Sequence, residues 1–396
     1  MNASNETAEM EEGIDLFGRR ERTGRSLGKS VIFIKQPTEF KEGIMLKGKL
    51  HSVIGNIARA SFLLMGVSVL TFTFAVNAFA LSNSSLNGEY YGVSFYADNW
   101  TCFGSGVFDG NGSLTYQSIQ TSDGELESGQ ELYSVSSDGA FTMGDNKGVA
   151  SPDGNFIFMV DLAGIVGMEI LVKKSSGLSN ATLNGEYYGV AFYWNEGGGT
   201  IFARTAFDGN GSFTFQHIQT SGGDLDNGQH FYSVSPDGAF TMGSNRGVVS
   251  SDGNLVFFVD LSEENIGMVI LVKKSSGLSN AILNGEYYDV NFFADDWTSF
   301  LSAAFDGNGS VTYQEIQNSD GDGELESGQD FYSVSSDGAF TIGDNRGVVS
   351  SDGNFVFMVD LSGTVGMEIL TKKSLPDPSG PVRQKAMPFI PLLLDD

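Results

Sequence analysis

The sequence contains a single cysteine, Cys102, among its 396 residues, which excludes an internal disulfide framework. Basic residues are also scarce: 22 Lys and Arg stand against 49 Asp and Glu, and the formal net charge is −27 at pH 7. A surface this negative repels nucleic acid and anionic lipid, because both are polyanions. The composition therefore predicts no nucleic-acid partner, and it suits a basic protein surface or a divalent cation.

The basic residues that do occur are concentrated near the N-terminus. A basic stretch runs from Met45 to Arg59 and is followed by residues 60–80, which carry no charge and end in Ala-Phe-Ala. This order of basic, apolar and small residues is typical of a secretory signal peptide. We expect residues 1–44 to be disordered or an over-extended N-terminus. We expect residues 45–80 to be the signal peptide or, if uncleaved, a membrane anchor and the chain's one contact with a membrane.

Everything after this segment is therefore expected to be exported to the periplasm, the cell surface or the extracellular medium. It consists of three similar repeats. Leu-Asn-Gly-Glu-Tyr-Tyr occurs at residues 86–91, 183–188 and 283–288, and Phe-Asp-Gly-Asn-Gly-Ser recurs in phase within each repeat. We place repeat 1 at residues 81–176, repeat 2 at 177–276 and repeat 3 at 277–373, followed by a Pro-rich tail at 374–396.

Each repeat predicts eight short strands. In repeat 1, Glu89–Tyr96 alternates apolar and polar residues, and Asp109-Gly-Asn-Gly112 has the residues of a hairpin turn. Turn residues follow about every ten positions, and no helical pattern occurs. The predicted fold class is all-β, with three tandem eight-stranded antiparallel meander domains that are barrel-like. The alternative is a single six-bladed β-propeller with two blades per repeat.

Three motifs in each repeat carry a family resemblance. They are Leu-Asn-Gly-x-Tyr, Phe-Asp-Gly-Asn-Gly-Ser and Tyr-Ser-Val-Ser-x-Asp-Gly-x-Phe-Thr. Together they resemble exported bacterial tandem-repeat proteins with lipocalin-like (calycin-like) β-barrel domains. The resemblance implies a barrel fold and hardly any function. Ser-Pro-Asp-Gly at residues 151–154 also resembles the blade motif of TolB-type propellers, and the apolar run 156–160 suits a strand between stacked blades.

The repeats allow a test for catalytic residues, because an activity that the repeats share requires its residues in all three. Histidine fails this test: His217 and His230 lie in repeat 2 alone, and His51 lies in the signal peptide. A catalytic triad built on His, or a zinc site with paired His, therefore cannot be built three times. The sequence lacks a Gly-x-Ser-x-Gly elbow, a Walker loop and a Cys-x-x-Cys pair. We predict no enzyme and no cofactor other than calcium.

Calcium is suggested by the loop that begins at Asp320 in repeat 3, where acidic residues alternate. Shorter forms occur at residues 125–127 and 224–226. The alternative interpretation is a solvated acidic loop. The candidate calcium ligands are Asp320, Asp322, Glu324 and Glu326.

Tryptophan gives the other candidate site. The three tryptophans are expected in the loop after the first strand of each repeat, beside acidic or amide side chains. A Trp in such a loop can stack on a glycan or close a barrel mouth over a small apolar ligand, or it can simply close its own core. The candidate ligand-binding residues are Trp100, Trp194, Trp297, Asp98, Asp295 and Asp296. We therefore expect a non-catalytic binding or structural role, with a calcium-stiffened adhesin or spacer and a hydrolase-like propeller as alternatives.

Overall fold

The computed structural model describes residues 80–97, 100–163, 167–194, 198–221, 228–262, 266–293, 297–319, 326–362 and 365–374. The segments expected at 1–44 and 45–80 lie outside these residues, apart from Ala80, as does the tail apart from Ser374. Among the described residues, no helix has the length and apolar character needed to span a membrane. The described repeats all belong to one compact unit, Thr73–Asp396.

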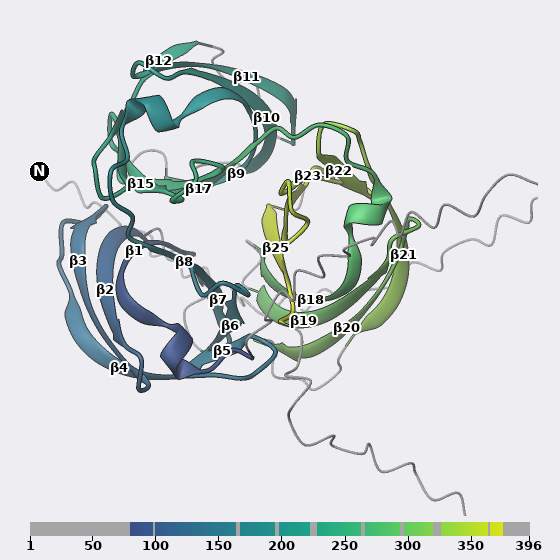
Figure 1. Ribbon diagram of the computed structural model, residues 1–396, viewed down its shortest axis with the longest axis horizontal. Coiled ribbons are helices and arrows are strands. Elements are labelled where there is room, and N and C mark those ends of the chain that lie inside the picture. The colour runs from purple at the N-terminus through teal and green to yellow at the C-terminus, as the bar shows by residue number, and fades with distance from the viewer. Residues whose placement is uncertain are drawn as a thin grey trace, which may run out of the picture. The chain divides into compact units, whose positions relative to one another are not determined.

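Repeat 1 forms a closed antiparallel barrel in which each strand pairs with the next and β1 pairs with β8. Figure 1 shows these strands curling round until β8 lies beside β1. The first strand, expected at Glu89–Tyr96, begins two residues earlier, at Asn87. The strands are β1 (Asn87–Tyr96), β2 (Trp100–Asp109), β3 (Ser113–Thr121), β4 (Ser128–Val135), β5 (Ala140–Met143), β6 (Asn146–Ala150), β7 (Phe156–Asp161) and β8 (Gly167–Lys173).

Repeats 2 and 3 follow the same meander. Repeat 3 closes fully, whereas the fourth strand of repeat 2 is interrupted at Tyr232, so that its sheet is nearly closed. The strands of repeat 2 are β9 (Asn184–Trp194), β10 (Gly199–Asp208), β11 (Ser212–Thr220), β12 (Gln229–Phe231), β13 (Ser233–Val234), β14 (Ala239–Met242), β15 (Asn245–Val249), β16 (Leu255–Asp260) and β17 (Ile266–Lys273). Those of repeat 3 are β18 (Asn284–Phe293), β19 (Trp297–Asp306), β20 (Ser310–Asn318), β21 (Ser327–Val334), β22 (Ala339–Ile342), β23 (Asn345–Val349), β24 (Phe355–Asp360) and β25 (Gly366–Lys372).

A short 3₁₀ helix precedes the first strand of each repeat. These helices are η1 (Asn83–Ser85), η2 (Asn180–Thr182) and η3 (Asn280–Ile282). In repeat 1, the Asn83 side-chain oxygen accepts a hydrogen bond from the amide of Val135 at 2.8 Å, which ties η1 to β4.

The expected Asp-Gly-Asn-Gly hairpin turn is present between β2 and β3. The Asp109 carboxylate accepts hydrogen bonds from the amides of Asn111 at 2.7 Å and Ser113 at 2.9 Å, which lower the pKa of that carboxyl. Gly110 and Gly112 have φ values of +74° and +109°, a region that favours glycine. The same residues make the same contacts in the other repeats. Turn chemistry thus sets one strand register in all three.

The barrels are built of two distinct apolar layers. In β1, Tyr90 points into the barrel and packs with Phe108 and Phe141, whereas Tyr91, Val93 and Phe95 point outward. These outward residues belong to a second core that contains equivalent residues of repeats 2 and 3. Phe95, Phe192 and Phe292 form its centre, with ring centroids 4.6 to 5.1 Å apart. The three barrels therefore share one core outside their own interiors.

This shared core explains an ambiguous strand. The run 156–160 is apolar on both faces, as the propeller interpretation required, but β7 is a barrel strand. Ile157 and Met159 face the barrel interior, while Phe156, Phe158 and Val160 face the shared core. The propeller alternative is therefore wrong: eight strands per repeat close on themselves instead of forming two stacked blades.

Polar contacts at the junctions between barrels repeat in cyclic order. The Tyr91 hydroxyl of repeat 1 donates to the Asp237 carboxylate of repeat 2 at 2.6 Å. Tyr188 makes the same contact with Asp337, and Tyr288 makes it with Asp138 of repeat 1, both at 2.6 Å. Each repeat thus donates to the next, and the third donates back to the first.

Candidate functional site

The interior of the first barrel contains an open cavity of about 470 Å³, which we call the cup. One end of the barrel is filled by the interior core around Tyr90 and Phe108. The other end is lined by residues of every strand of the repeat, and this volume lies in the range of small-molecule sites. Residues that line the cup include Ser94, Tyr96, Trp100, Cys102, Gly104, Tyr116, Ser118, Met143, Asn146, Glu169 and Leu171.

Small residues keep the cup open. Gly92 of β1 and Gly104 of β2 are paired directly with each other on the inner face of the barrel. Because both are glycines, neither adds a side chain to the interior. A Cβ at Gly92 would approach the Leu171 side chain to 2.8 Å, and one at Gly104 would approach the Gln117 carbonyl oxygen to 3.0 Å. The strand registers place Asp289 and Leu301 of repeat 3 at these two positions. Repeat 1 therefore has less side-chain volume than repeat 3 at these two inward positions.

Glu169 is a half-buried carboxylate in the wall of the cup. It lies on β8 opposite Ser94 of β1, and its Oε1 accepts a hydrogen bond from the Tyr96 hydroxyl. Burial raises the pKa of the Glu169 carboxyl, against the opposing effect of that hydrogen bond. Burial, and then Glu169 itself, raise the pKa of Tyr96 well above its ordinary value. The side chain is only partly screened from solvent, because it forms the cavity wall.

Two aromatic rings lie beside this carboxylate. Tyr96 and Trp100 are paired across β1 and β2, with ring centroids 4.7 Å apart and planes tilted by 42°. Tyr116 lines the wall on β3. The cup therefore combines flat apolar surface with a half-buried acid, which is the composition expected of a site that holds and orients an organic molecule.

The lining also has a strongly one-sided charge. Five of its side chains are acidic, and none of the lining residues is Lys, Arg or His. A concave surface of low dielectric focuses such a field. The acidic lining residues are Glu127, Glu131, Asp145, Asp161 and Glu169.

Cys102 also lines the cup. It lies on β2, with its thiol 3.5 Å from the Ser118 hydroxyl. Burial raises the pKa of this thiol to about 11. Cys102 is therefore a neutral thiol at physiological pH and a weak nucleophile.

The interior of repeat 2 differs in kind. Ala191, Ile201 and Ala203 form a small apolar cluster there, packed by Tyr193 and Val269. Val269 occupies the position of Glu169, as the pairing of β17 with β9 shows. This interior offers no carboxylate at that position.

The interior of repeat 3 carries two acidic side chains where repeat 1 has one. Asp289 and Glu368 both face inward, and the Asn345 amide donates to Glu368 Oε1 at 3.0 Å. Burial, and then Glu368, raise the pKa of Asp289 well above its ordinary value. Burial also raises the pKa of Glu368 to about 7, with further contributions from Asp360 and Asp330. The Asn291 amide, turned toward Asp289, donates to its Oδ1 at 2.7 Å.

The tryptophans expected in loops begin or end strands. Trp100 begins β2, Trp297 begins β19 and Trp194 ends β9. The loop between the first two strands of each repeat is therefore shorter than the sequence suggests. Trp100 lines the cup, and Trp297 packs edge-on against Phe293 with centroids 4.6 Å apart. Asp98, Asp295 and Asp296 lie outside the described residues, so their proximity to the tryptophans stays a prediction.

Most of the calcium candidates also lie outside the described residues, namely Asp320, Asp322 and Glu324. Glu326 is described and exposed, and its amide donates to the Glu315 carboxylate at 3.1 Å. Among the described residues, no three His, Cys, Asp or Glu side chains are placed to hold a metal ion. Calcium binding by the loop at 320–326 stays a prediction.

Glu169 and Tyr96 were not selected from the sequence. Candidate catalytic residues were required to occur in all three repeats. Glu169 does not meet this requirement, because repeat 2 has Val269 at this position. A usable signal was present: Glu169 lies between Met168 and Ile170 in a strand that is otherwise apolar. A carboxylate on the inner face of a buried strand is costly unless it is paired or serves a ligand.

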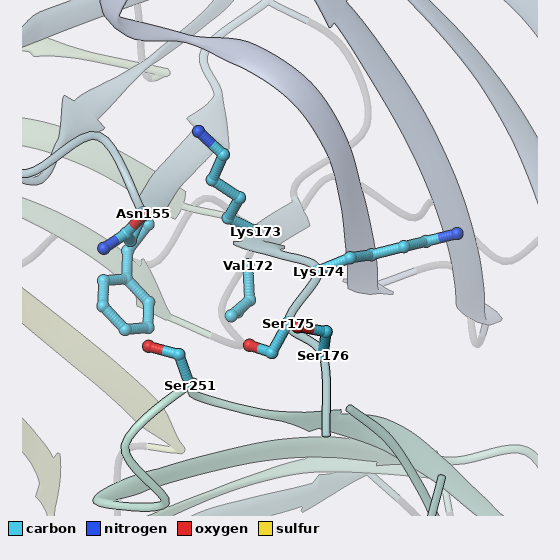
Figure 2. Close-up of a pocket in the computed structure, with 8 residues that line it drawn as sticks. Asn155, Val172, Lys173, Lys174, Ser175, Ser176 and Ser251 are labelled. Atoms are coloured by element: carbon cyan, nitrogen blue, oxygen red, sulfur yellow. The ribbon is translucent and has the colours of Figure 1, made fainter. Parts of the chain in front are cut away.

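A second cavity, of about 370 Å³, lies beside the junction of repeats 1 and 2. Figure 2 shows the ammonium groups of Lys173 and Lys174 pointing away from Ser175, Ser176 and Ser251, and away from each other. Lys174 is paired with Glu89 at 3.0 Å and lies 4.3 Å from the centre of the Tyr91 ring. The Lys174 ammonium is thus already paired within the protein, so the cup is the better candidate for a ligand site.

No protein-family model matches the sequence, and no curated protein matches it. One similar solved structure is a protein of unknown function of the DUF3598 family from Nostoc punctiforme, at 11% identity and a TM-score of 0.20, covering 49% of this chain and 97% of that one. Another is the Helicobacter pylori β clamp, at 4% identity and a TM-score of 0.12, covering 72% and 92%. Such low scores carry no weight for function, so the site is interpreted from this chain's own residues.

Proposed function

We propose that this protein is an exported, non-catalytic binding protein that holds one small organic molecule in the cup of its first barrel. The observation that carries the proposal is the cavity of about 470 Å³, lined by Tyr96, Trp100 and the half-buried Glu169. Eight-stranded barrels of this size hold side chains or one small ligand. The resemblance of the repeat motifs to lipocalin-like barrels supports the same interpretation.

The non-catalytic part of the proposal rests on the chemistry of the cup. Its thiol has a pKa raised to about 11, and its half-buried carboxylate is engaged by the Tyr96 hydroxyl. No histidine is among its lining residues. A thiol is activated by a lowered pKa or by a histidine beside it, and the lining offers neither to Cys102.

The sequence led us to expect a shared activity in all three repeats. The differing interiors favour a single site instead, because repeat 2 has Val269 where repeat 1 has Glu169, and repeat 3 has the larger Asp289 and Leu301 where repeat 1 has glycine. In this proposal repeats 2 and 3 serve the scaffold through the shared core.

The test is a fragment screen by saturation-transfer NMR on the full chain and on a variant with a filled cup. Gly104→Leu introduces the residue that repeat 3 has at this position, Leu301. The pairing of β19 with β20 shifts its register at Leu301, just as the pairing of β2 with β3 shifts at Gly104. We expect hits with the parent chain and a loss of at least about tenfold in affinity with Gly104→Leu, because the ligand volume is occupied.

The control is Ala203→Leu, the same change at the equivalent position of repeat 2. It should leave affinity within about twofold, provided that circular dichroism shows both variants folded. Hits that survive Gly104→Leu, or that are lost only in Ala203→Leu, would place the site outside the cup.

A further inference from the structure

We infer that the cup selects organic ammonium ions: ligands that carry a protonated amine on an aromatic or apolar body. The inference rests on the proposed function and specifies its ligand class. It comes from the combination, in one cavity, of a half-buried carboxylate, an aromatic pair and a lining without cations.

Glu169 provides the first contact. Among the described residues, its one hydrogen-bond partner is the Tyr96 hydroxyl, which engages Oε1. Oε2 is left for a ligand, on the wall of the cavity. A charge-assisted hydrogen bond from an ammonium group to a carboxylate is about twice as strong as a neutral one. An ammonium ion would thus pair with a half-buried carboxylate that has a single hydrogen-bond donor among the described residues.

The aromatic pair provides the second contact. The Tyr96 and Trp100 rings lie 4.7 Å apart, and Tyr96 joins them to Glu169 through its hydroxyl. A cation bound to Glu169 shares the cavity with these rings, and the face of a ring such as Trp100 attracts positive charge. The apolar body of the ligand then packs against Leu171 and Met143 farther along the wall.

The field of the cup provides selection against other ligands. Four further carboxylates line it, namely Glu127, Glu131, Asp145 and Asp161. An anion would have to approach all five acids without a compensating Lys or Arg in the lining, whereas a cation is drawn in. Repeat 2 has Val269 in place of the acid. Repeat 3 keeps an acid there, Glu368, but has Asp289 and Leu301 at the two positions where repeat 1 has glycine.

The experiment uses three probes that share a phenyl ring and a two-carbon chain: phenethylamine, 2-phenylethanol and phenylacetate. Each is titrated into the full chain at pH 7 by isothermal calorimetry. We expect phenethylamine to bind with 1:1 stoichiometry and at least about tenfold more tightly than the alcohol, with phenylacetate weaker still. Glu169→Gln keeps the size of the side chain and an acceptor for Tyr96, and should remove the tenfold preference.

Two variants complete the design. Glu89→Gln makes the same chemical change on the outer face, where Glu89 pairs with Lys174, and should leave amine binding unchanged. Trp100→Leu should weaken the amine by more than it weakens the alcohol, and it supplies the test if Glu169→Gln fails to fold. Equal binding of amine and alcohol would overturn the inference while leaving a ligand site in the cup. Fragment hits that survive Gly104→Leu would overturn both.

Discussion

Raising the pH from 4.5 to 8 is expected to lower the free energy of unfolding by about 3 kcal/mol through Glu368. The pKa of this carboxyl is raised from 4.5 to about 7 in the folded chain, first by burial. Below pH 4.5 both the folded and the unfolded chain hold the proton. As the pH rises toward 7 the unfolded carboxyl ionises first, so unfolding becomes progressively more favourable. The stabilisation is lost once the pH passes the folded pKa.

Asp289 acts in the same direction, because its pKa is raised by burial and by Glu368. Urea unfolding at pH 4.5, 6, 7 and 8 measures the effect. Glu368→Gln should weaken the dependence of the free energy of unfolding on pH between pH 5 and 7, so that the slope is flatter. It should also stabilise the chain at pH 8. Asp289→Gly, which installs the residue of repeat 1 at this position, should do the same in part. The exposed Glu125→Gln is the control and should leave the slope unchanged. An unaltered slope in Glu368→Gln would refute the assignment.

Phe95→Ala is expected to destabilise the whole chain by about 3 to 5 kcal/mol, the usual loss for a buried Phe. Phe95 is fully buried although it points out of its own barrel, because it packs on Phe192 and Phe292. Truncation at this point removes contacts from all three repeats at once. The urea transition should move to lower concentration while remaining single by circular dichroism and by Trp fluorescence.

The matched control is Phe331→Ala, because Phe331 is 76% exposed on β21 and its loss should change stability by less than about 0.5 kcal/mol. Independent barrels would give a different result. In that case Phe95→Ala would split the transition into an early step for repeat 1 and unchanged steps for the others.

The strands could be predicted from the sequence because local rules decide them. Alternation in β1 and the Asp-Gly-Asn-Gly turn after β2 are short-range signals, and both agree with the structure. Whether β7 belonged to a blade or a barrel could not be decided in this way. Its two apolar faces are the same in both cases, and only the pairing of β1 with β8 distinguishes them.

The candidate site was missed for a related reason. The three repeats agree at turns and on their outward faces, which all repeats need for the shared core, as Phe95, Phe192 and Phe292 illustrate. They differ on the inward face, where Glu169 has Val269 as its counterpart in repeat 2. Residues common to all three repeats therefore mark the shared scaffold, and Glu169 of the cup is not among them.

The most direct test of an open, electronegative cup uses Cys102, the one cysteine in the chain. Its thiol lines the cavity, so its reaction rate reports which reagents enter. We would compare a methanethiosulfonate that carries an ethylammonium group with one that carries an ethylsulfonate group. Each rate on the folded chain is divided by the rate on the urea-unfolded chain, to remove intrinsic reactivity.

We predict that the cationic reagent modifies folded Cys102 at least about tenfold faster than the anionic one after this correction. Phenethylamine should slow the modification, and Gly104→Leu should nearly abolish it. A thiol that reacts only after unfolding would show that the cup is closed. Equal corrected rates for the two reagents would show that its acidic lining does not select cations.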